Sequence, residues 1–161
     1  MTLVLHRIDD RLIHGQVVVG WGQPLSVAFI LLVDDEVAAS EWEQELYRMG
    51  VPPEMEVHFL SVGDALAQLS KFEEDPRHGI LLTGDIETMR RLIDGGGISQ
   101  VNLGGIHHRA GRTQRLRYVF LSSDEENALR DIATHGVNVS AQDVPGARPI
   151  PLDDLLAGVA G

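Results

Sequence analysis

The sequence predicts one α/β domain built on an open, twisted and mostly parallel β-sheet of about six to seven strands, with helices on both faces. Short runs of β-type residues alternate with helical patterns along all 161 residues, and such alternation favours parallel strands joined by helical crossovers. Several runs are almost continuously apolar, which is typical of strands covered on both faces. No long linker, low-complexity tract or internal repeat divides the chain, so residues 1–161 are expected to form a single domain.

Seven segments are predicted as strands because they are short and rich in apolar and β-branched residues. In chain order they are residues 3–8, 27–33, 56–60, 79–83, 100–103, 118–121 and 137–142. The carboxyl ends of parallel strands meet at one edge of a sheet, and functional loops gather there near a point where the strand order reverses. We therefore expect the functional site at that edge.

Helices are predicted between these strands from their start signals and spacing. Apolar residues at helical spacing follow Ser61 and Asp85, and both of these residue types are suitable N-caps. The stretch at 123–126, Ser-Asp-Glu-Glu, has the pattern of a capping box for another helix. One more helix is indicated by the spacing of three large apolar residues, Trp42, Leu46 and Met49.

The charge of the chain is uneven along its length. The chain holds 13 Lys and Arg residues against 24 Asp and Glu residues, a net charge of −11. So acidic a chain is expected to repel nucleic-acid phosphates, which argues against a nucleic-acid partner. Residues 95–123, however, contain no acidic residue and hold four arginines, Arg109, Arg112, Arg115 and Arg117. This stretch carries +4 and the remainder of the chain therefore carries −15.

The composition excludes several classes of site and location. The chain has no cysteine, which excludes disulfides, thiolate metal sites and cysteine nucleophiles. The longest apolar run, residues 27–33, is far shorter than the ~20 residues that a membrane span needs. The N-terminus lacks the pattern of a signal peptide. We expect a soluble, cytoplasmic protein.

Polar residues of several kinds crowd the turn that follows the first predicted strand, residues 7–17. His14 stands where this turn leads into an apolar helical stretch, and the adjacent Gly15 lets the backbone approach closely. A helix start offers free N–H groups to an anion, and Arg11 can bind phosphate oxygens in a bidentate way. Because a neutral imidazole is a competent nucleophile, the turn is a candidate phosphoryl-accepting site.

In this interpretation Asp9 or Asp10 orients the imidazole or Arg11. The alternative is a capping loop in which the histidine bonds only to backbone and the aspartates and arginines pair with one another. The residue pattern alone leaves both open. A histidine phosphatase would need an arginine directly before the histidine, where Ile13 stands.

A second candidate is the segment 102–109, at the end of the fifth predicted strand. Its paired glycines, of which Gly104 is the first, would permit close backbone approach, and a cationic loop beginning at Arg109 follows. His107 and His108 point to opposite faces of an extended segment, so they are poor joint metal ligands. The segment is interpreted as a second wall of the anion site or a docking surface, or else as a solvated hairpin.

The remaining polar features are interpreted as structural. Three acids at 34–36 follow the second predicted strand; they suggest a magnesium site or, more simply, a helix cap at Asp34. His58, His78 and His135 are interpreted as structural or surface histidines. The chain has no phosphate-loop, dinucleotide-binding or zinc-protease motif, so we expect no cofactor and no metal.

The first candidate segment is similar to a motif of a known protein family. Residues 8–17, Ile-Asp-Asp-Arg-Leu-Ile-His-Gly-Gln-Val, closely resemble the active-site loop of the IIB components of the bacterial phosphotransferase system (PTS), mannose/fructose/sorbose family. The resemblance covers nearly the whole chain, because it continues through residues 33–37, 52–53, 102–107 and 136–139.

The resemblance implies a phosphohistidine carrier at the cytoplasmic side of a transporter. A phosphorylated IIA domain would pass a phosphoryl group to His14, which would pass it to a sugar held by membrane IIC and IID partners. By the match of the motif, Arg11 steadies the phosphate with Asp10 nearby, and His107 belongs to the facing loop. The residues expected to contact the phosphate or a partner are Arg7, Asp9, Gly15, Gln16, Gly104, His107 and Arg109.

The chain departs from the family pattern in two respects. Thr83-Gly84-Asp85 stands where many relatives have a Lys-Asn-Pro-like turn, and Lys71 is the only lysine beside twelve arginines. Both departures bear on docking surfaces rather than on phosphorylation. A regulatory phosphoacceptor and a plain anion-binding module are the alternative functions. The sequence leaves open the sugar, the phosphorylated ring nitrogen and the oligomeric state, a homodimer included.

Overall fold

The structure is a computed structural model that describes residues 3–158. Its strands are β1 (Leu3–Ile8), β2 (Val27–Val33), β3 (Glu56–Leu60), β4 (His78–Thr83), β5 (Gln100–Leu103), β6 (Thr113–Leu116), β7 (Val119–Leu121), β8 (Asn138–Ala141) and β9 (Ile150–Pro151). Its helices are η1 (Gln16–Trp21, a π-helix), α1 (Asp35–Ala38), α2 (Glu41–Arg48), α3 (Val62–Glu73), α4 (Ile86–Asp94), α5 (Ser123–Thr134) and α6 (Leu152–Ala157).

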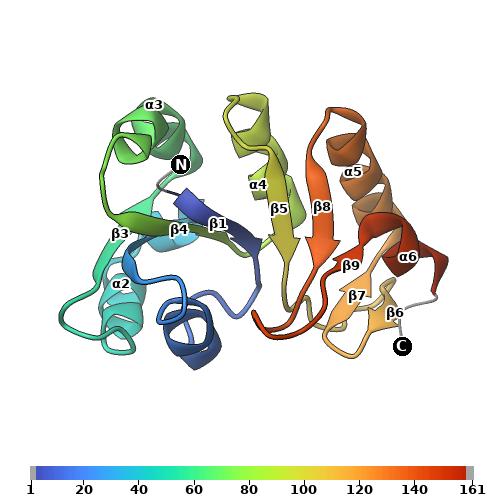
Figure 1. The fold of residues 1–161 in the computed structure, drawn as a ribbon, viewed down its shortest axis with the longest axis horizontal. Helices are drawn as coiled ribbons and strands as arrows, with labels where there is room; N and C mark the ends of the chain where they lie inside the picture. The colour runs from blue at the N-terminus through green and yellow to red at the C-terminus, as the bar shows by residue number, and fades with distance from the viewer. Residues whose placement is uncertain (1–2, 159–161) are drawn as a thin grey trace.

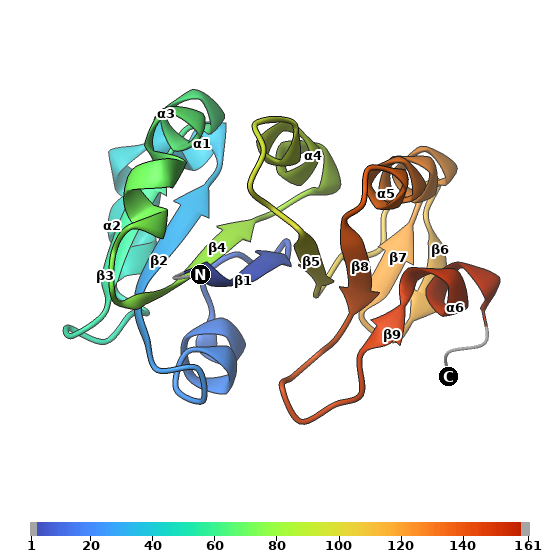
Figure 2. The ribbon, with the colours of Figure 1, turned by 45° about the horizontal axis from the view of Figure 1, so that its top comes forward.

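The central element is a seven-stranded sheet of order β3-β2-β4-β1-β5-β8-β9. Its strands are parallel from β3 to β8, and only β9 pairs in the antiparallel sense, against β8. Figures 1 and 2 show the sheet twisting between two layers of helices. The predicted fold class is confirmed, and six of the predicted strands lie in this sheet.

The two faces of the sheet bury separate hydrophobic clusters. One face packs against α3, α4, α5 and α6 through residues such as Phe72, Met89 and Leu129. The other packs against η1 and the segment that contains α1 and α2, and Trp21 and Val37 belong to its cluster. Strands such as β2 feed both clusters with alternate residues, which explains their continuous apolar sequences.

Two expectations need correction. The segment predicted as a strand at 118–121 is outside the main sheet: β7 pairs with β6 in a separate hairpin, and the seventh strand of the sheet is β9. The capping box of α5 is formed by Ser122 and Glu125 rather than one residue later. Both registers place Ser three residues before Glu, so the sequence pattern did not distinguish them.

The helix predicted from Trp42, Leu46 and Met49 is α2, but these three residues do not face the core. The exposed fractions of Trp42, Leu46 and Met49 are 73%, 53% and 84%. The helix packs inward through Tyr47 instead, and the Gln44 side chain donates hydrogen bonds to the backbone carbonyls of α1. Helical spacing therefore identified the helix but not its buried side.

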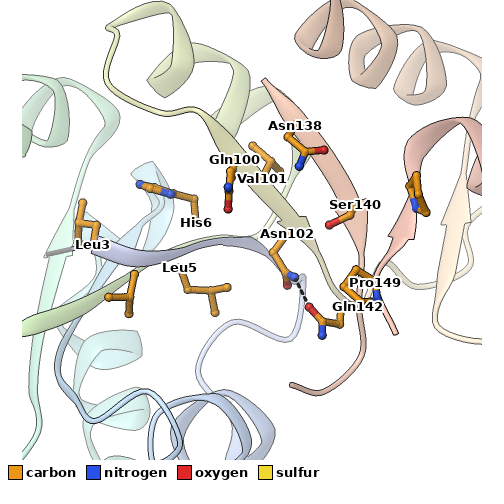
Figure 3. A pocket seen from close by; sticks show the side chains of 12 residues that line it. Leu3, Leu5, His6, Gln100, Val101, Asn102, Asn138, Ser140, Gln142 and Pro149 are labelled. Carbon is orange, nitrogen blue, oxygen red and sulfur yellow. Dashed lines mark hydrogen bonds between the residues drawn. The ribbon is translucent and has the colours of Figure 1, made fainter. Parts of the chain in front are cut away.

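β1 and β5 pair only at their carboxyl ends, where Arg7 and Ile8 lie opposite Asn102 and Leu103. Toward their amino ends the two strands part and leave a groove of about 560 Å³, lined by uncharged side chains (Figure 3). His6 on β1 borders this groove; it is 5% exposed and its Nε2 has no hydrogen-bond partner among the described residues. Burial lowers the pKa of His6 to about 4, so the imidazole is neutral near pH 7.

At the carboxyl ends of β1 and β5 the connections leave to opposite faces. The chain after β1 crosses to the face covered by η1, whereas the chain after β5 leads to β6 and β7 on the other face. Such a divergence leaves a crevice at the strand ends, which is where parallel α/β sheets bind ligands. The candidate turn at 7–17 lies at this point.

Candidate active site

The turn that follows β1 is held in place by the end of β4 and by the turn that follows it. The backbone N–H of Asp9 donates to Thr83 O (2.9 Å), and Leu12 N donates to Asp9 O (3.0 Å). Leu12 has φ +58° although it is not glycine, and its buried side chain packs into the hydrophobic cluster. A Cβ on Gly84 would lie 3.0 Å from that side chain. Residues 83–85, where the sequence departs from the family pattern, thus lie beneath the candidate loop and support it.

Arg7 and Asp9 form the buried base of the site, and both side chains are 0% exposed. Arg7 Nη2 lies 3.3 Å from Asp9 Oδ2, and the guanidinium stacks over the Trp21 ring at 4.9 Å from its centroid. Arg7 also donates to the Asn102 side chain and to the backbone carbonyls of Gln142 and Asp143. These bonds compensate for the removal of the charge from water, although burial still lowers the pKa of Arg7.

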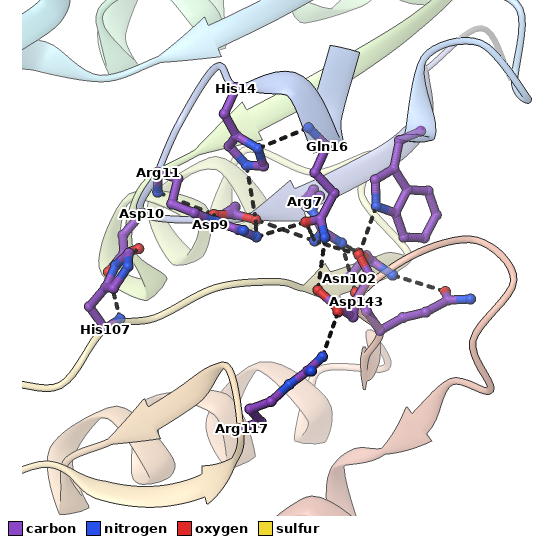
Figure 4. A network of polar contacts seen from close by, with 12 residues as sticks. Arg7, Asp9, Asp10, Arg11, His14, Gln16, Asn102, His107, Arg117 and Asp143 are labelled. Carbon is purple, nitrogen blue, oxygen red and sulfur yellow. Dashed lines mark hydrogen bonds and ion pairs between the residues drawn. The ribbon is translucent and has the colours of Figure 1, made fainter. Parts of the chain in front are cut away.

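The Asp9 carboxylate is ionised and lies among three side chains (Figure 4). Burial alone would raise its pKa, but the nearby His14 ring, hydrogen bonding by Arg11 and the charge of Arg7 hold the pKa well below its ordinary value. Arg11 Nε and Nη2 donate to the two oxygens of Asp9 at 2.9 and 2.7 Å, which raises the pKa of Arg11. The Arg11 side chain is 33% exposed, so it connects the buried carboxylate to the surface.

His14 lies above this carboxylate with its two ring nitrogens in different surroundings. Nε2 is buried, lies 3.5 Å from Asp9 Oδ2 and has no hydrogen bond of ordinary length among the described residues. Nδ1 accepts the backbone N–H of Gln16 at 3.2 Å, at the start of η1. The side chain as a whole is 19% exposed. The proton is therefore placed on Nε2, facing Asp9, and Nδ1 carries the lone pair.

Gln16 connects this group to the segment that follows β8. Its Oε1 accepts from Arg11 Nη2 at 2.7 Å, and its Nε2 donates to Asp143 Oδ1 at 3.0 Å. Trp21 Nε1 donates to the backbone carbonyl of Asp143 at 3.2 Å. Arg117, from the β6–β7 hairpin, lies 3.2 Å from Asp143 Oδ2. Three distant parts of the chain thus meet at the site.

Asp10 faces the loop after β5 rather than His14. Its two oxygens lie 2.8 Å from the backbone nitrogen and 2.6 Å from the Nδ1 of His107, and Asp10 N donates to Gly105 O at 2.8 Å. His108 points away, and its ring packs edge-on against Phe120. The opposite orientation expected for the two histidines is present, and His107 borders the candidate site.

The glycines of the two candidate segments behave differently. A Cβ on Gly104 would lie 2.4 Å from Arg7 Nη2 and 2.7 Å from Asp9 Oδ2, and one on Gly105 would lie 3.0 Å from Arg11 Nε. The close approach expected at this glycine pair is therefore present. A Cβ on Gly15 would meet nothing within 4 Å. Gly15 consequently leaves open space beside His14 instead of packing against the chain.

Most of the cationic stretch is neutralised by ion pairs. Arg112 pairs with Glu125 at 2.8 Å, Arg115 with Glu126 at 2.6 Å, and Arg117 with Asp143. Among residues 3–158, Arg109 alone of the four has no ion pair. It lines a hollow of about 400 Å³ together with Asp10 and Leu12. Of the four positive charges in this stretch, the charge of Arg109 is therefore the one that the described residues leave unpaired, and it lies next to the candidate loop.

The remaining sequence candidates have structural partners. Asp34 caps α1 by accepting Val37 N at 2.9 Å, and Asp35 accepts Val62 N at 2.9 Å. Across residues 3–158 there is no group of three or more His, Asp or Glu residues that could hold a metal ion. His78 and His135 contact backbone carbonyls, and His58 packs on Phe72.

Sequence reasoning missed three members of the site: Asn102 as a partner of Arg7, and Gln142 with Asp143 after β8. One signal was available. Gln142 ends the last predicted strand and Asp143 directly follows it, and polar residues at that position belong to the functional edge of the sheet. The fold and the site together define an α/β domain in which a histidine and two arginines surround a buried carboxylate at the ends of parallel strands.

Comparison with known proteins identifies the family. Residues 3–160 match the model described as PTS system sorbose subfamily IIB component. The chain belongs to this family. It is 33% identical over 158 residues to the N-acetylgalactosamine-specific phosphotransferase enzyme IIB component 1 of Escherichia coli K12, covering 95% of this chain and 98% of that protein.

Two further relatives cover the whole chain. The crystal structure of the IIB domain of the sorbose permease from Klebsiella pneumoniae superposes with a TM-score of 0.89 at 28% identity, covering 99% of each chain. The mannose-specific EIIAB component of Escherichia coli K12 is 30% identical over 164 residues, covering 99% of this chain but only 50% of that protein. The IIB unit is therefore also found within a longer protein named EIIAB.

Family membership establishes the reaction. A IIB component of this type is a phosphotransferase that takes a phosphoryl group from IIA and passes it to sugar, and it works with membrane IIC and IID components. The relatives are each named as specific for a sugar, N-acetylgalactosamine, mannose or sorbose, which favours transfer to a sugar over the regulatory alternative. No helix within residues 3–158 is long and apolar enough to cross a membrane.

Proposed function

We propose that His14 is the residue that carries the phosphoryl group, and that Nδ1 is its acceptor atom. The observation that supports this assignment most directly is the different environment of the two ring nitrogens. Nε2 is buried against the Asp9 carboxylate, where an incoming phosphoryl group would meet like charge. Nδ1 accepts a single backbone N–H and lies next to the open space at Gly15.

The transfer exchanges one P–N bond for another and then for a P–O bond. The lone pair of His14 Nδ1 attacks the phosphorus as the bond to the IIA histidine breaks. The His14 ring gains positive charge, which Asp9 stabilises through the proton on Nε2. In the second step a sugar hydroxyl attacks the phosphorus, the bond to Nδ1 breaks, and the hydroxyl proton is released. Between the two steps, while Nδ1 carries the phosphoryl group, the backbone N–H of Gln16 is free to donate to a phosphoryl oxygen.

The remaining site residues act on charge and position. Arg11 turns two donor atoms toward Asp9 and keeps one third of its side chain exposed, so its free edge stabilises the transferred group. Arg7 holds Asp9, and Gly104 provides the space for that pair. Asp10 acts as a positioning residue that fixes the loop of His107. His107, Gln16 and Arg109 border the surface that partners approach.

We further propose that residues 1–161 act as one IIB domain, because the segment after the last parallel strand completes the site made after the first. We also propose that the protein acts in the cytoplasm, in peripheral contact with its transporter. The homodimer remains a prediction that sedimentation tests.

Labelling with phosphoenolpyruvate, the general PTS proteins and a matching IIA domain tests the site. We expect an acid-labile, base-stable modification that is lost in His14→Ala and retained in His107→Ala. Nuclear magnetic resonance of the phosphorylated protein should assign the phosphorus to Nδ1. Equal labelling of His14→Ala would refute the site, and a signal from Nε2 would refute the assignment of the nitrogen.

A further inference from the structure

The outward side of α2 carries an apolar stripe that the core does not use. Trp42, Leu46 and Met49 occupy positions i, i+4 and i+7, which lie on one side of a helix. They account for three of the six large apolar side chains that the described residues expose, and Met49 is the most exposed of them at 84%. Single exposed apolar residues are ordinary, but a contiguous stripe marks an interaction site.

The surroundings of this stripe are strongly acidic. Residues 34–56 contain eight Asp and Glu residues and one basic residue, Arg48, so this segment carries −7 of the net −11. Glu41 and Glu45 are exposed on α2 itself, and Arg48 is already paired with Glu45 at 2.7 Å. A partner that covers the stripe must therefore bring positive charge as well as apolar side chains.

The α2 helix, which carries the stripe, and the η1 helix, which follows the candidate active-site turn, cover the same face of the sheet. The hydrophobic cluster that contains Val17 and Trp21 of η1 also contains Tyr47 of α2, so both helices cover the same face of the sheet. In Figure 1, α2 and the blue helix η1 both lie below the sheet, opposite α3, α4 and α5. His14 immediately precedes η1 and its N-cap Gly15. A single partner can thus approach this face from one direction.

We propose that the α2 stripe, defined by Trp42, Leu46 and Met49 with Glu41 and Glu45 beside it, docks on a basic cytoplasmic loop of the membrane IIC or IID component. The cytoplasmic loops of membrane proteins carry an excess of Lys and Arg, which complements the −7 of this segment. The proposal rests on the function proposed above, since a phosphorylated IIB component must come to the membrane components to deliver its group.

Charge also decides against two other occupants. A second copy of the chain would bring the same acidic rim against itself, and like charges brought together disfavour association. The anionic lipids of a cytoplasmic leaflet would likewise be repelled. The test below includes both, and either one would overturn the proposal if it explained the binding.

The experiment measures binding of the full-length protein to the host's IIC–IID complex of this family in nanodiscs of phosphatidylcholine with an anionic phospholipid, and to the same nanodiscs without protein. One variant combines Trp42→Ser with Met49→Ser, and a second combines Glu41→Lys with Glu45→Lys. The matched control, Leu66→Ser with Glu74→Lys, changes an exposed leucine on α3 and the exposed acid that follows its last residue, on the opposite face. Phosphorylation of His14 by IIA is measured on every variant.

Each α2 variant is expected to weaken binding by at least about tenfold, because the first removes a buried aromatic anchor and the second places like charges opposite a basic partner. The control variant and the phosphorylation of His14 should be unchanged. Unchanged binding by both α2 variants would overturn the proposal. Equal binding to protein-free nanodiscs would overturn it in favour of lipid. A lower sedimentation mass of the α2 variants than of the parent, each measured alone, would overturn it in favour of a second copy. Loss of His14 labelling in the parent protein would instead refute the proposed function and not this surface.

Discussion

The side chain of Arg11 donates to both oxygens of the buried Asp9 carboxylate, at 2.9 and 2.7 Å. The guanidinium that faces the surface is therefore partly neutralised before any phosphoryl group arrives. A carrier must release what it accepts, and a fully unpaired arginine would hold a phosphoryl group more tightly than a reversible step requires. In the role proposed for Arg11, this pairing would weaken its hold on the transferred group enough to keep the step reversible.

Arg11→Ala is expected to slow phosphoryl transfer from IIA by about 10- to 1,000-fold, because it removes a charge-assisted donor. The fold should persist, since the side chain is partly exposed. Rapid-quench measurement of the transfer rate checks this expectation. Arg130→Ala, which removes an exposed arginine bonded only to Asn127 on its own helix, is the control. Equal rates for the two variants would remove Arg11 from the mechanism.

Asp9→Asn is expected to destabilise the protein by about 3 kcal/mol, because it leaves the fully buried Arg7 without its carboxylate. Urea unfolding measures the change in the free energy of unfolding. Glu87→Gln, which breaks an exposed ion pair with Arg90, should cost much less. If both substitutions have similar small effects, the buried pair does not anchor the loop.

His6 is expected to make stability fall as the pH is lowered from about 6.5 to about 4. Its pKa is about 4 in the folded protein, whereas an unfolded histidine takes up its proton near pH ~6.5. The unfolded state therefore binds more protons within this window, and the loss on acidification is on the order of 3 kcal/mol. Stability is retained above the window.

His6→Leu tests this origin of the pH dependence. Unfolding of the parent and the variant is compared at several pH values between 4 and 7, so that carboxylates common to both cancel. The difference in the free energy of unfolding should change with pH for the reason given above. A constant difference would contradict a lowered pKa at His6.

Gly104→Ala is expected to destabilise the protein and to slow phosphorylation, because its Cβ would lie 2.4 Å from Arg7 Nη2. The loss should reach about 1–3 kcal/mol, as for other insertions into a packed interior. Gly63→Ala in α3 is a matched control: its Cβ would come no closer than 3.9 Å to another group, and alanine favours a helix. Thermal unfolding and labelling of His14 report the two effects, and a neutral Gly104→Ala would contradict the tight packing at the site.

The alternating pattern was sufficient to predict the parallel sheet and its strands, because strands buried on both faces are apolar throughout. It did not predict β9, since two residues give no periodic signal. The exposed side of α2 was also missed. Spacing shows that Trp42 and Leu46 share a side, but which side packs depends on Tyr47 and on distant residues.

The sequence indicated the two segments of the candidate site, 7–17 and 102–109, but not the contacts that the segment after β8 makes with them. His14, Arg11 and Asp9 fall within one turn, whereas Asp143 approaches Gln16 from 127 positions away. The ion pairs of Arg112 and Arg115 with α5 were not predicted either. The sequence shows the charge of each residue, but only the fold shows which charges neutralise one another.

The link between Gln16 and Asp143 has a consequence for synthesis of the chain. The loop with His14 is made early, but its supports after β8 leave the ribosome last. A nascent or truncated chain therefore lacks the carbonyls of Gln142 and Asp143 that hold Arg7. We therefore expect incomplete chains to accept phosphoryl groups poorly, so that partial products would not drain them from the donor.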